Sequence, residues 1–114
     1  MTHEDFEKYM MSLPEVWLDF PFGEKLAVYK FGKAKDGEGK IVALVQIGSK
    51  PLRVSLKCDP LLAKILRERY ETVLPGENLS KKHWNTVICS GQLADDEVLD
   101  LARLSYELAI KDVR

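Results

Sequence analysis

Residues 52–60 of this 114-residue chain, LRVSLKCDP, pass from one periodicity to another within nine positions. Apolar residues stand at every second position from Leu52 to Leu56, a pattern typical of a strand with one buried face. Asp59 can then cap a helix that begins at Pro60. Proline is favoured at the first position of a helix, because the backbone N–H that it lacks would have no partner within the helix. A strand that passes directly into a helix predicts a fold that mixes the two elements.

Two further strands are predicted upstream of this stretch. Residues 26–31 alternate, with Ala27, Tyr29 and Phe31 on one face. Residues 41–47 are apolar enough to lie in the centre of a sheet. The segments that join these strands are short and rich in turn-forming residues, so the sequence predicts an antiparallel meander.

Helices are predicted at both ends of the chain. Apolar residues spaced three and four apart from Phe6 to Leu13 share one helix face, and Pro14 ends this helix. The aromatic segment 16–23 that follows is expected to form a loop across the core, because its apolar side chains are costly to expose. Three carboxylates at residues 95–97 mark the start of the last helix, where the helix dipole favours negative charge.

Between these regions, the sequence predicts a short helical turn at residues 81–84 and a strand at residues 86–89. The predicted order is therefore α-β-β-β-α-α-β-α within a single domain, residues 1–114. An antiparallel sheet with helices on one face makes this an α+β fold, a two-layer sandwich.

The composition is that of an ordinary soluble globular protein, with 46% hydrophobic and 31% charged residues. No apolar stretch approaches the roughly 20 residues that span a bilayer, so no membrane association is expected. The chain does not start with a basic segment followed by an apolar one, so we expect no secretory signal and a cytoplasmic location. Cys58 and Cys89 stand 31 positions apart and are expected to be buried free thiols.

The net charge conceals a strong segregation along the chain. The formal charge is −1 in total, but residues 1–24 carry −5, residues 25–85 carry +7 and residues 86–114 carry −3. A cationic face would supply the sequence-independent part of an affinity for nucleic acid. Lysines at hairpin edges also improve solubility and prevent edge-to-edge pairing, and the charge alone leaves both interpretations open.

No residue pattern in the sequence names a reaction. The histidines are His3 and His83, and neither has Cys, Asp or Glu partners at the spacing of a metal site. No serine or cysteine stands in a nucleophile motif, and no glycine-rich phosphate loop is present. We therefore expect a protein that is not an enzyme and that uses no metal or cofactor.

The densest group of polar and aromatic residues is Ser80-Lys81-Lys82-His83-Trp84-Asn85-Thr86-Val87. Trp84 can pack as a structural anchor beneath the sheet, with its indole N–H on a carbonyl group. It can instead form a partly exposed platform between cations, on which a base or an aromatic ligand stacks. We favour the structural role for Trp84 and a surface function for Lys81 and Lys82.

The sequence resembles the MmcQ/YjbR family, small bacterial proteins whose fold is grouped with the CyaY (frataxin) type. The resemblance runs in order across nearly all of the chain, although Ser80 stands where asparagine is common. The matching pieces are Phe22-Gly23, Val54–Pro60, Leu66-Arg67, Pro75-Gly76, Ser80–Val87 and Ser105-Tyr106-Glu107-Leu108.

This resemblance implies helices packed on an antiparallel sheet and a DNA-binding protein in which two hairpin loops act as a double wing. In this sequence the wings would be residues 33–40 and 49–51. We therefore predict contacts made mainly to the phosphate backbone. The predicted DNA-binding residues are Lys33, Lys35, Lys40, Lys50, Arg53, Lys81 and Lys82.

A competing hypothesis is a module without catalytic activity that binds a small molecule or a protein in an aromatic cleft near Trp84. The candidate cleft residues are Trp17, Phe20, Phe22, His83, Trp84 and Asn85. A continuous cationic surface across both wings would favour DNA, whereas a formed aromatic pocket beside Trp84 would favour a ligand.

Overall fold

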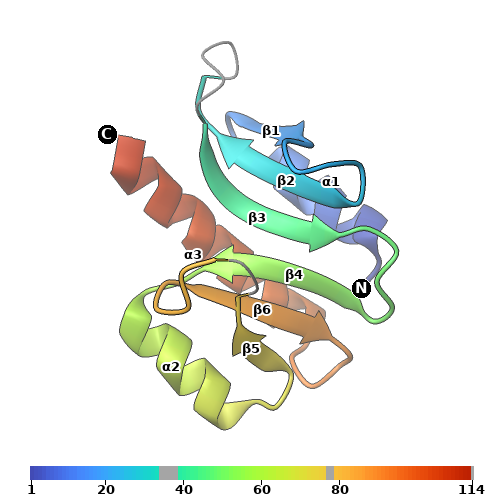
Figure 1. Ribbon diagram of the computed structural model, residues 1–114, viewed down its shortest axis with the longest axis vertical. Helices are drawn as coiled ribbons and strands as arrows, with labels where there is room; N and C mark the ends of the chain where they lie inside the picture. The colour runs from blue at the N-terminus through green and yellow to red at the C-terminus, as the bar shows by residue number, and fades with distance from the viewer. Residues whose placement is uncertain (34–38, 77–78, 114) are drawn as a thin grey trace.

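The computed structural model describes residues 1–33, 39–76 and 79–113. Within them, six strands form one antiparallel sheet with the order β1-β2-β3-β4-β6-β5, accompanied by three helices (Figure 1). The elements along the chain are α1 (His3–Ser12), β1 (Val16–Asp19), β2 (Leu26–Phe31), β3 (Lys40–Gln46), β4 (Leu52–Lys57), α2 (Pro60–Arg69), β5 (Val73–Pro75), β6 (Trp84–Cys89) and α3 (Asp95–Val113). The predicted α+β sandwich is confirmed.

Side-chain caps explain where the first two helices begin. Thr2 Oγ1 accepts a hydrogen bond from the backbone N–H of Asp5 at 3.1 Å, and the Asp5 carboxylate accepts from the N–H of Thr2 at 3.2 Å. The Asp59 carboxylate accepts from the N–H groups of Leu61 and Leu62, as the Asp-Pro pair predicts. Local sequence therefore determines both helix starts.

All three helices pack against the same face of the sheet. Figure 1 shows α3 crossing behind the central strands, with α1 beside it and α2 near the β5–β6 edge. Phe6 and Met10 of α1 and Val98 of α3 are fully buried in this layer, and α2 contributes the half-buried Leu66. None of the described helices has the length and apolarity needed to cross a membrane.

A bulge in β3 is held from the helical layer. The register between β2 and β3 shifts by one residue at Val42, which is the extra residue of the bulge. The buried Ser105 of α3 donates from Oγ to the Val42 carbonyl oxygen at 2.6 Å and accepts from the backbone N–H of Lys57 at 3.0 Å. One hydroxyl group therefore ties α3 to the start of β3 and to the end of β4.

The next residue of α3, Tyr106, connects this helix to the segment between α1 and β1. The Tyr106 hydroxyl donates to the carbonyl oxygen of Pro14 at 2.8 Å. Its ring meets that of Phe31 edge-on, with centroids 5.5 Å apart and planes at 89°. Tyr106 therefore fastens the connection between α1 and β1 to the last helix.

The aromatic segment 16–23 does not cross the core, so this part of the prediction is wrong. Its first four residues form β1, an edge strand paired with β2. Phe20 and Phe22 follow the strand and are 44% and 63% exposed. Pairing with β2 gives the segment the backbone hydrogen bonds that a loop over the core would lack, and it leaves both rings near the surface.

Two features between α2 and β6 also differ from the prediction. Strand β5 was not expected, because three residues with only Val73 buried are too short to show a periodicity. The segment before β6 is a turn rather than a short helix. The N–H groups of His83 and Trp84 both bond to the Ser80 carbonyl oxygen, and the strand begins already at Trp84.

Both cysteines are free thiols, as expected, with Cys58 buried and Cys89 half-buried. Burial raises the pKa of both thiols, that of Cys89 to about 11. Since only the thiolate is nucleophilic, neither residue is prepared for covalent chemistry.

We expect Ser105→Ala to lower the free energy of unfolding by about 1–3 kcal/mol for each polar group that it leaves buried without a partner. The groups concerned are the Val42 carbonyl and the Lys57 N–H. Urea denaturation followed by circular dichroism measures the change. Asp100→Ala, at an exposed position of the same helix, is the control, and equal stability of the two variants would contradict the role of Ser105.

Cys89 in the folded protein should react with iodoacetamide at least tenfold more slowly at pH 8 than in the urea-unfolded chain. Its pKa of about 11, against an ordinary 9.0, leaves about a hundredfold less thiolate at that pH. The rate should keep rising with pH up to about 11. Mass spectrometry of the peptide that contains Cys89 measures both rates, and equal rates would refute the shift.

Candidate functional site

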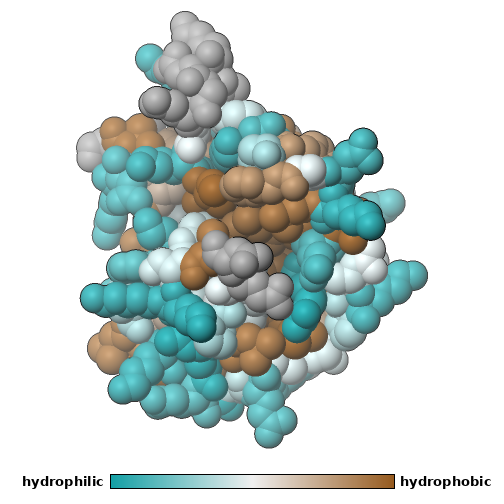
Figure 2. Space-filling view, in the orientation of Figure 1, coloured by the Kyte–Doolittle hydropathy of each residue, from teal (hydrophilic) through white to brown (hydrophobic). Residues whose placement is uncertain are grey.

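The sheet face opposite the helices carries a second apolar cluster. Val28, Leu44 and Trp84 are buried there, at 0%, 5% and 9% exposure. Figure 2 shows this apolar area in the middle of the visible face, bordered by hydrophilic side chains. No helix within the described ranges contributes to it. The residues that we call the open-face cluster are Leu26, Val28, Ile41, Leu44, Leu79 and Trp84.

The character of this face changes from apolar to polar across the sheet. Strand pairing places Val28 of β2 beside Leu44 of β3, Leu44 beside Ser55 of β4, and Ser55 beside Thr86 of β6. The hydroxyl groups of Ser55 and Thr86 are hydrogen-bonded to each other at 2.8 Å. The open-face cluster is therefore followed, on the neighbouring strands β4 and β6, by two hydroxyl groups that are hydrogen-bonded to each other.

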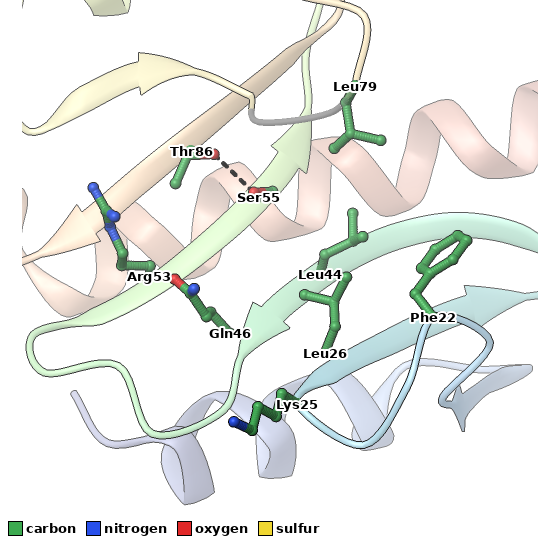
Figure 3. Close-up of a pocket in the computed structure, with 9 residues that line it drawn as sticks. All are labelled: Phe22, Lys25, Leu26, Leu44, Gln46, Arg53, Ser55, Leu79 and Thr86. Carbon is green, nitrogen blue, oxygen red and sulfur yellow. Dashed lines mark hydrogen bonds between the residues drawn. The ribbon is translucent and has the colours of Figure 1, made fainter.

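A cavity of about 460 Å³ lies on this face (Figure 3). Figure 3 shows the apolar side chains of Phe22, Leu26, Leu44 and Leu79 gathered at one end, while Arg53, Gln46 and Lys25 lie toward the other. Arg53 is half-buried, and Lys25 is exposed. The lining residues are Phe22, Lys25, Leu26, Leu44, Gln46, Arg53, Ser55, Leu79 and Thr86. No histidine, cysteine or carboxylate is among these described residues.

Trp84 is buried in the open-face cluster and is not among the residues that line the cavity. The Gly76 N–H donates to the Trp84 carbonyl oxygen at 2.9 Å. A side chain at position 76 would place its Cβ only 2.8 Å from the Cβ of Trp84, so glycine is needed for this close approach. The turn that begins at Ser80 and the residue after β5 together fix the backbone of Trp84.

Asn85, the next residue of β6, lies on the opposite face, where the helices pack. Its side-chain amide donates to the Ala63 carbonyl oxygen at 3.2 Å and accepts from Arg67 Nη1 at 2.8 Å. The same Arg67 nitrogen donates to the Lys81 carbonyl oxygen at 2.8 Å. Asn85 therefore joins α2 to β6, away from the cavity.

The other predicted cleft residues are dispersed. The indole N–H of Trp17 donates to the Gly32 carbonyl oxygen at 2.9 Å, and Lys30 Nζ lies 5.3 Å from the ring centroid, at the β1 edge of the sheet. Phe20 is exposed and, like His83, is not among the lining residues. Of the six candidates, Phe22 lines the cavity and Trp84 lies in the adjoining cluster.

The predicted DNA-binding wings lie at opposite ends of β3. Lys33 and Lys40 flank the β2–β3 connection, whereas Lys50 belongs to the β3–β4 turn and Arg53 is the second residue of β4. Seven residues of β3 separate the two ends by about 20 Å. The three lysines are exposed, and Lys35 lies outside the described residues.

Lys81 and Lys82 add exposed charge at one of these ends. They precede β6, whose first residue pairs with the last residue of β4, Lys57. Because β4 runs antiparallel to β3, this is the end of the sheet that also carries Lys40. The structure therefore places four of the predicted cationic residues at one end, while Lys50 and Arg53 lie at the other.

Sequence reasoning missed most of the residues that line the cavity. The lining residues that were not among the predicted site residues are Lys25, Leu26, Leu44, Gln46, Ser55, Leu79 and Thr86. One signal was present: strands β2 and β3 carry apolar residues on both faces. Such strands are typical of sheets that bury both sides.

Comparison with known proteins places the chain in a family. A sequence model described as YjbR matches residues 11–108. The YjbR protein of Escherichia coli K12 is 32% identical over 112 residues, covering 96% of this chain and 88% of that protein. The YbdF protein of Escherichia coli O157:H7 is 31% identical, covering 95% and 84%.

Solved structures agree with these relatives. A crystal structure of a Deinococcus radiodurans protein with a DUF419 domain matches with a TM-score of 0.92 and 34% identity, covering 99% of this chain and 81% of that one. A Pseudomonas syringae protein matches with a TM-score of 0.79 and 25% identity, covering 96% and 99%. The chain therefore belongs to the YjbR family.

Proposed function

We propose that this protein binds a small molecule in the cavity on the open face of the sheet. The observation that carries the proposal is a hollow of about 460 Å³, apolar at one end and polar at the other. Ligand sites in proteins typically have this size and this combination of apolar lining and few polar groups. Of the residues of the aromatic cleft predicted near Trp84, Phe22 lines this cavity.

The construction of the cavity supports this proposal. Central strands supply much of its lining, and the lining residue Leu44 is buried and paired with the buried Val28. Phe22 and Leu79 contribute from loops, and Phe22 is 63% exposed. A floor of paired strands with apolar side chains from loops suits a preformed site, which lowers the entropic cost of binding.

We propose binding without a catalytic step. The hydroxyl groups of Ser55 and Thr86 are the nucleophile candidates in the described lining, and they are bonded to each other. A hydroxyl nucleophile requires an adjacent base, and the described lining residues include no histidine or carboxylate to serve as one.

The neutral dye Nile red should bind in the cavity, where it should fluoresce more strongly than in water. The Leu26→Trp variant should bind the dye at least tenfold more weakly, because the larger side chain fills the apolar end of the cavity. Phe22→Ala should weaken binding of the dye several-fold, since it removes an exposed wall of the cavity without altering the core. Leu61→Trp, at a position of α2 that is 67% exposed, is the control for dye bound elsewhere. If folded Leu26→Trp and Phe22→Ala proteins both bind the dye as the unaltered protein does, the cavity is not the site.

A second candidate function is binding of DNA through the backbone. The observation that favours it is the group of exposed lysines at one end of the sheet, Lys33, Lys40, Lys81 and Lys82. The opposite wing lies about 20 Å away along β3, so we propose a contact made by one end rather than by both wings. Such a contact positions a duplex without reading its sequence.

Anisotropy of a labelled random duplex between about 50 mM and about 200 mM salt tests this candidate. Each neutralised phosphate adds about 0.9 to the log–log slope, so Lys40→Ala, Lys81→Ala and Lys82→Ala together should lower the slope by up to about 2.7. The control combines Lys25→Ala, Lys50→Ala and Lys64→Ala, which remove equal charge elsewhere. No binding at the lower salt concentration, or equal slopes for both triple variants, would refute a DNA contact at this end.

A further inference from the structure

We propose that the surface formed by α2 and α3 binds a second copy of this chain in a two-fold symmetric dimer, in which α2 of each protomer lies against α3 of the other. This surface belongs to the helical layer, on the opposite side of the sheet from the cavity. The inference therefore goes beyond the proposed function and does not depend on it.

The first support is an apolar seam between α2 and α3. The two helices leave a crevice of about 10 Å³, whose lining includes Leu66 of α2 together with Leu101 and Leu104 of α3. A space of this size holds at most one water molecule, so the seam is not a site for a small-molecule ligand. It is a surface over which the side chains of another protein molecule can pack.

Apolar side chains continue from the crevice to the solvent. Ile65 of α2 is 45% exposed, and Leu104 of α3 is 42% exposed. On each helix, apolar residues spaced three and four apart form a stripe on the side that adjoins the crevice. The stripes consist of Leu62, Ile65 and Leu66 on α2 and of Leu101, Leu104 and Leu108 on α3. Contact with a second apolar surface would remove both stripes from water.

The second support is the opposite charge of the two helices, which identifies a second copy as the partner. Helix α2 carries three cationic side chains and one carboxylate, whereas α3 carries six carboxylates and two cationic side chains. Pairs within each helix, Lys64 with Glu68 and Arg103 with Glu107, neutralise part of this charge. A partner of a single charge sign would be repelled by one of the helices. In a dimer that sets α2 against α3 of the other copy, charges of opposite sign face each other.

The third support is the direction of the two helices. Lys57 Nζ, which precedes α2, lies 3.0 Å from an oxygen of Asp112 in the last turn of α3. Thr72, which follows α2, donates from its backbone N–H and its hydroxyl to the side-chain oxygen of Gln92, which precedes α3. The end of α2 therefore lies beside the start of α3. A two-fold axis parallel to the seam places the end of α2 of one protomer against the start of α3 of the other.

This axis brings together one pair of charged residues twice. Arg69 is exposed in the last turn of α2, where it lies over the Tyr70 ring, and Asp100 is exposed near the start of α3. Neither takes part in an ion pair with another described residue. In the dimer, Arg69 of each protomer lies toward Asp100 of the other.

Sedimentation velocity at protein concentrations from about 10 µM to about 500 µM tests the dimer, because the dimeric fraction rises with concentration. We expect the unaltered protein to shift from monomer toward dimer over this range. Ile65→Asp and Leu104→Asp should each raise the dissociation constant at least tenfold, since each places a charge in the apolar seam. Met11→Asp, at a similarly exposed apolar position of α1, should leave the dissociation constant unchanged.

An exchange of charges tests the arrangement of the two copies. Arg69→Glu and Asp100→Lys should each weaken the dimer several-fold, because each brings like charges together, and the two changes combined should restore it. Circular dichroism establishes that each variant is folded before its dissociation constant is compared.

Three results would overturn the inference. A protein that sediments as a monomer at every concentration forms no such dimer. Equal dissociation constants for the Ile65→Asp, Leu104→Asp and Met11→Asp variants would show that the copies meet through another surface. A double variant that dimerises no more tightly than either single variant would refute the placement of α2 against α3 of the other protomer.

Discussion

The hydroxyl group of Ser105 is the contact on which the arrangement of the two layers depends. It satisfies a carbonyl group at the bulge in β3 and an N–H group at the end of β4, and it does so from the middle of α3. The bond to the Val42 carbonyl oxygen is buried, the bond from the Lys57 N–H is partly buried, and Ser105 itself is fully buried. A larger side chain would not fit there, and an apolar one would not bond. The Ser105 hydroxyl group therefore fixes the position of α3 relative to both the bulge in β3 and the end of β4.

This constraint also explains why the two faces of the sheet differ. All described helices pack on the same face of the sheet, where Ser105 and Tyr106 of α3 make their hydrogen bonds. The other face must bury its apolar side chains with loops, since the described helices do not cover it. Loops that carry Phe22 and Leu79 cover only part of such a surface, and a hollow remains between them. The cavity is in this sense a consequence of one-sided helix packing.

Much of the fold could be predicted because its signals are local. The alternation from Leu52 to Leu56 and the cap at Asp59 each involve neighbours in sequence, and strand and helix begin where these signals indicate. The cavity could not be predicted in the same way, because strand register brings its lining residues together. Ser55 and Thr86 meet only once β4 is known to pair with β6. Asn85 was placed in a cleft with Trp84 because the strand was expected to begin after both.

Because successive side chains of β6 face opposite sides of the sheet, the length of the turn before β6 decides which side each of them faces. Trp84 faces the cavity side and Asn85 faces the helices, so one strand serves as floor for a pocket and as anchor for α2. A single residue added or lost between Ser80 and Trp84 would exchange the two side chains. The amide would then enter a hydrocarbon surface, and the indole would displace α2. We therefore expect members of the family to keep the same number of residues in this turn even where the residues themselves differ.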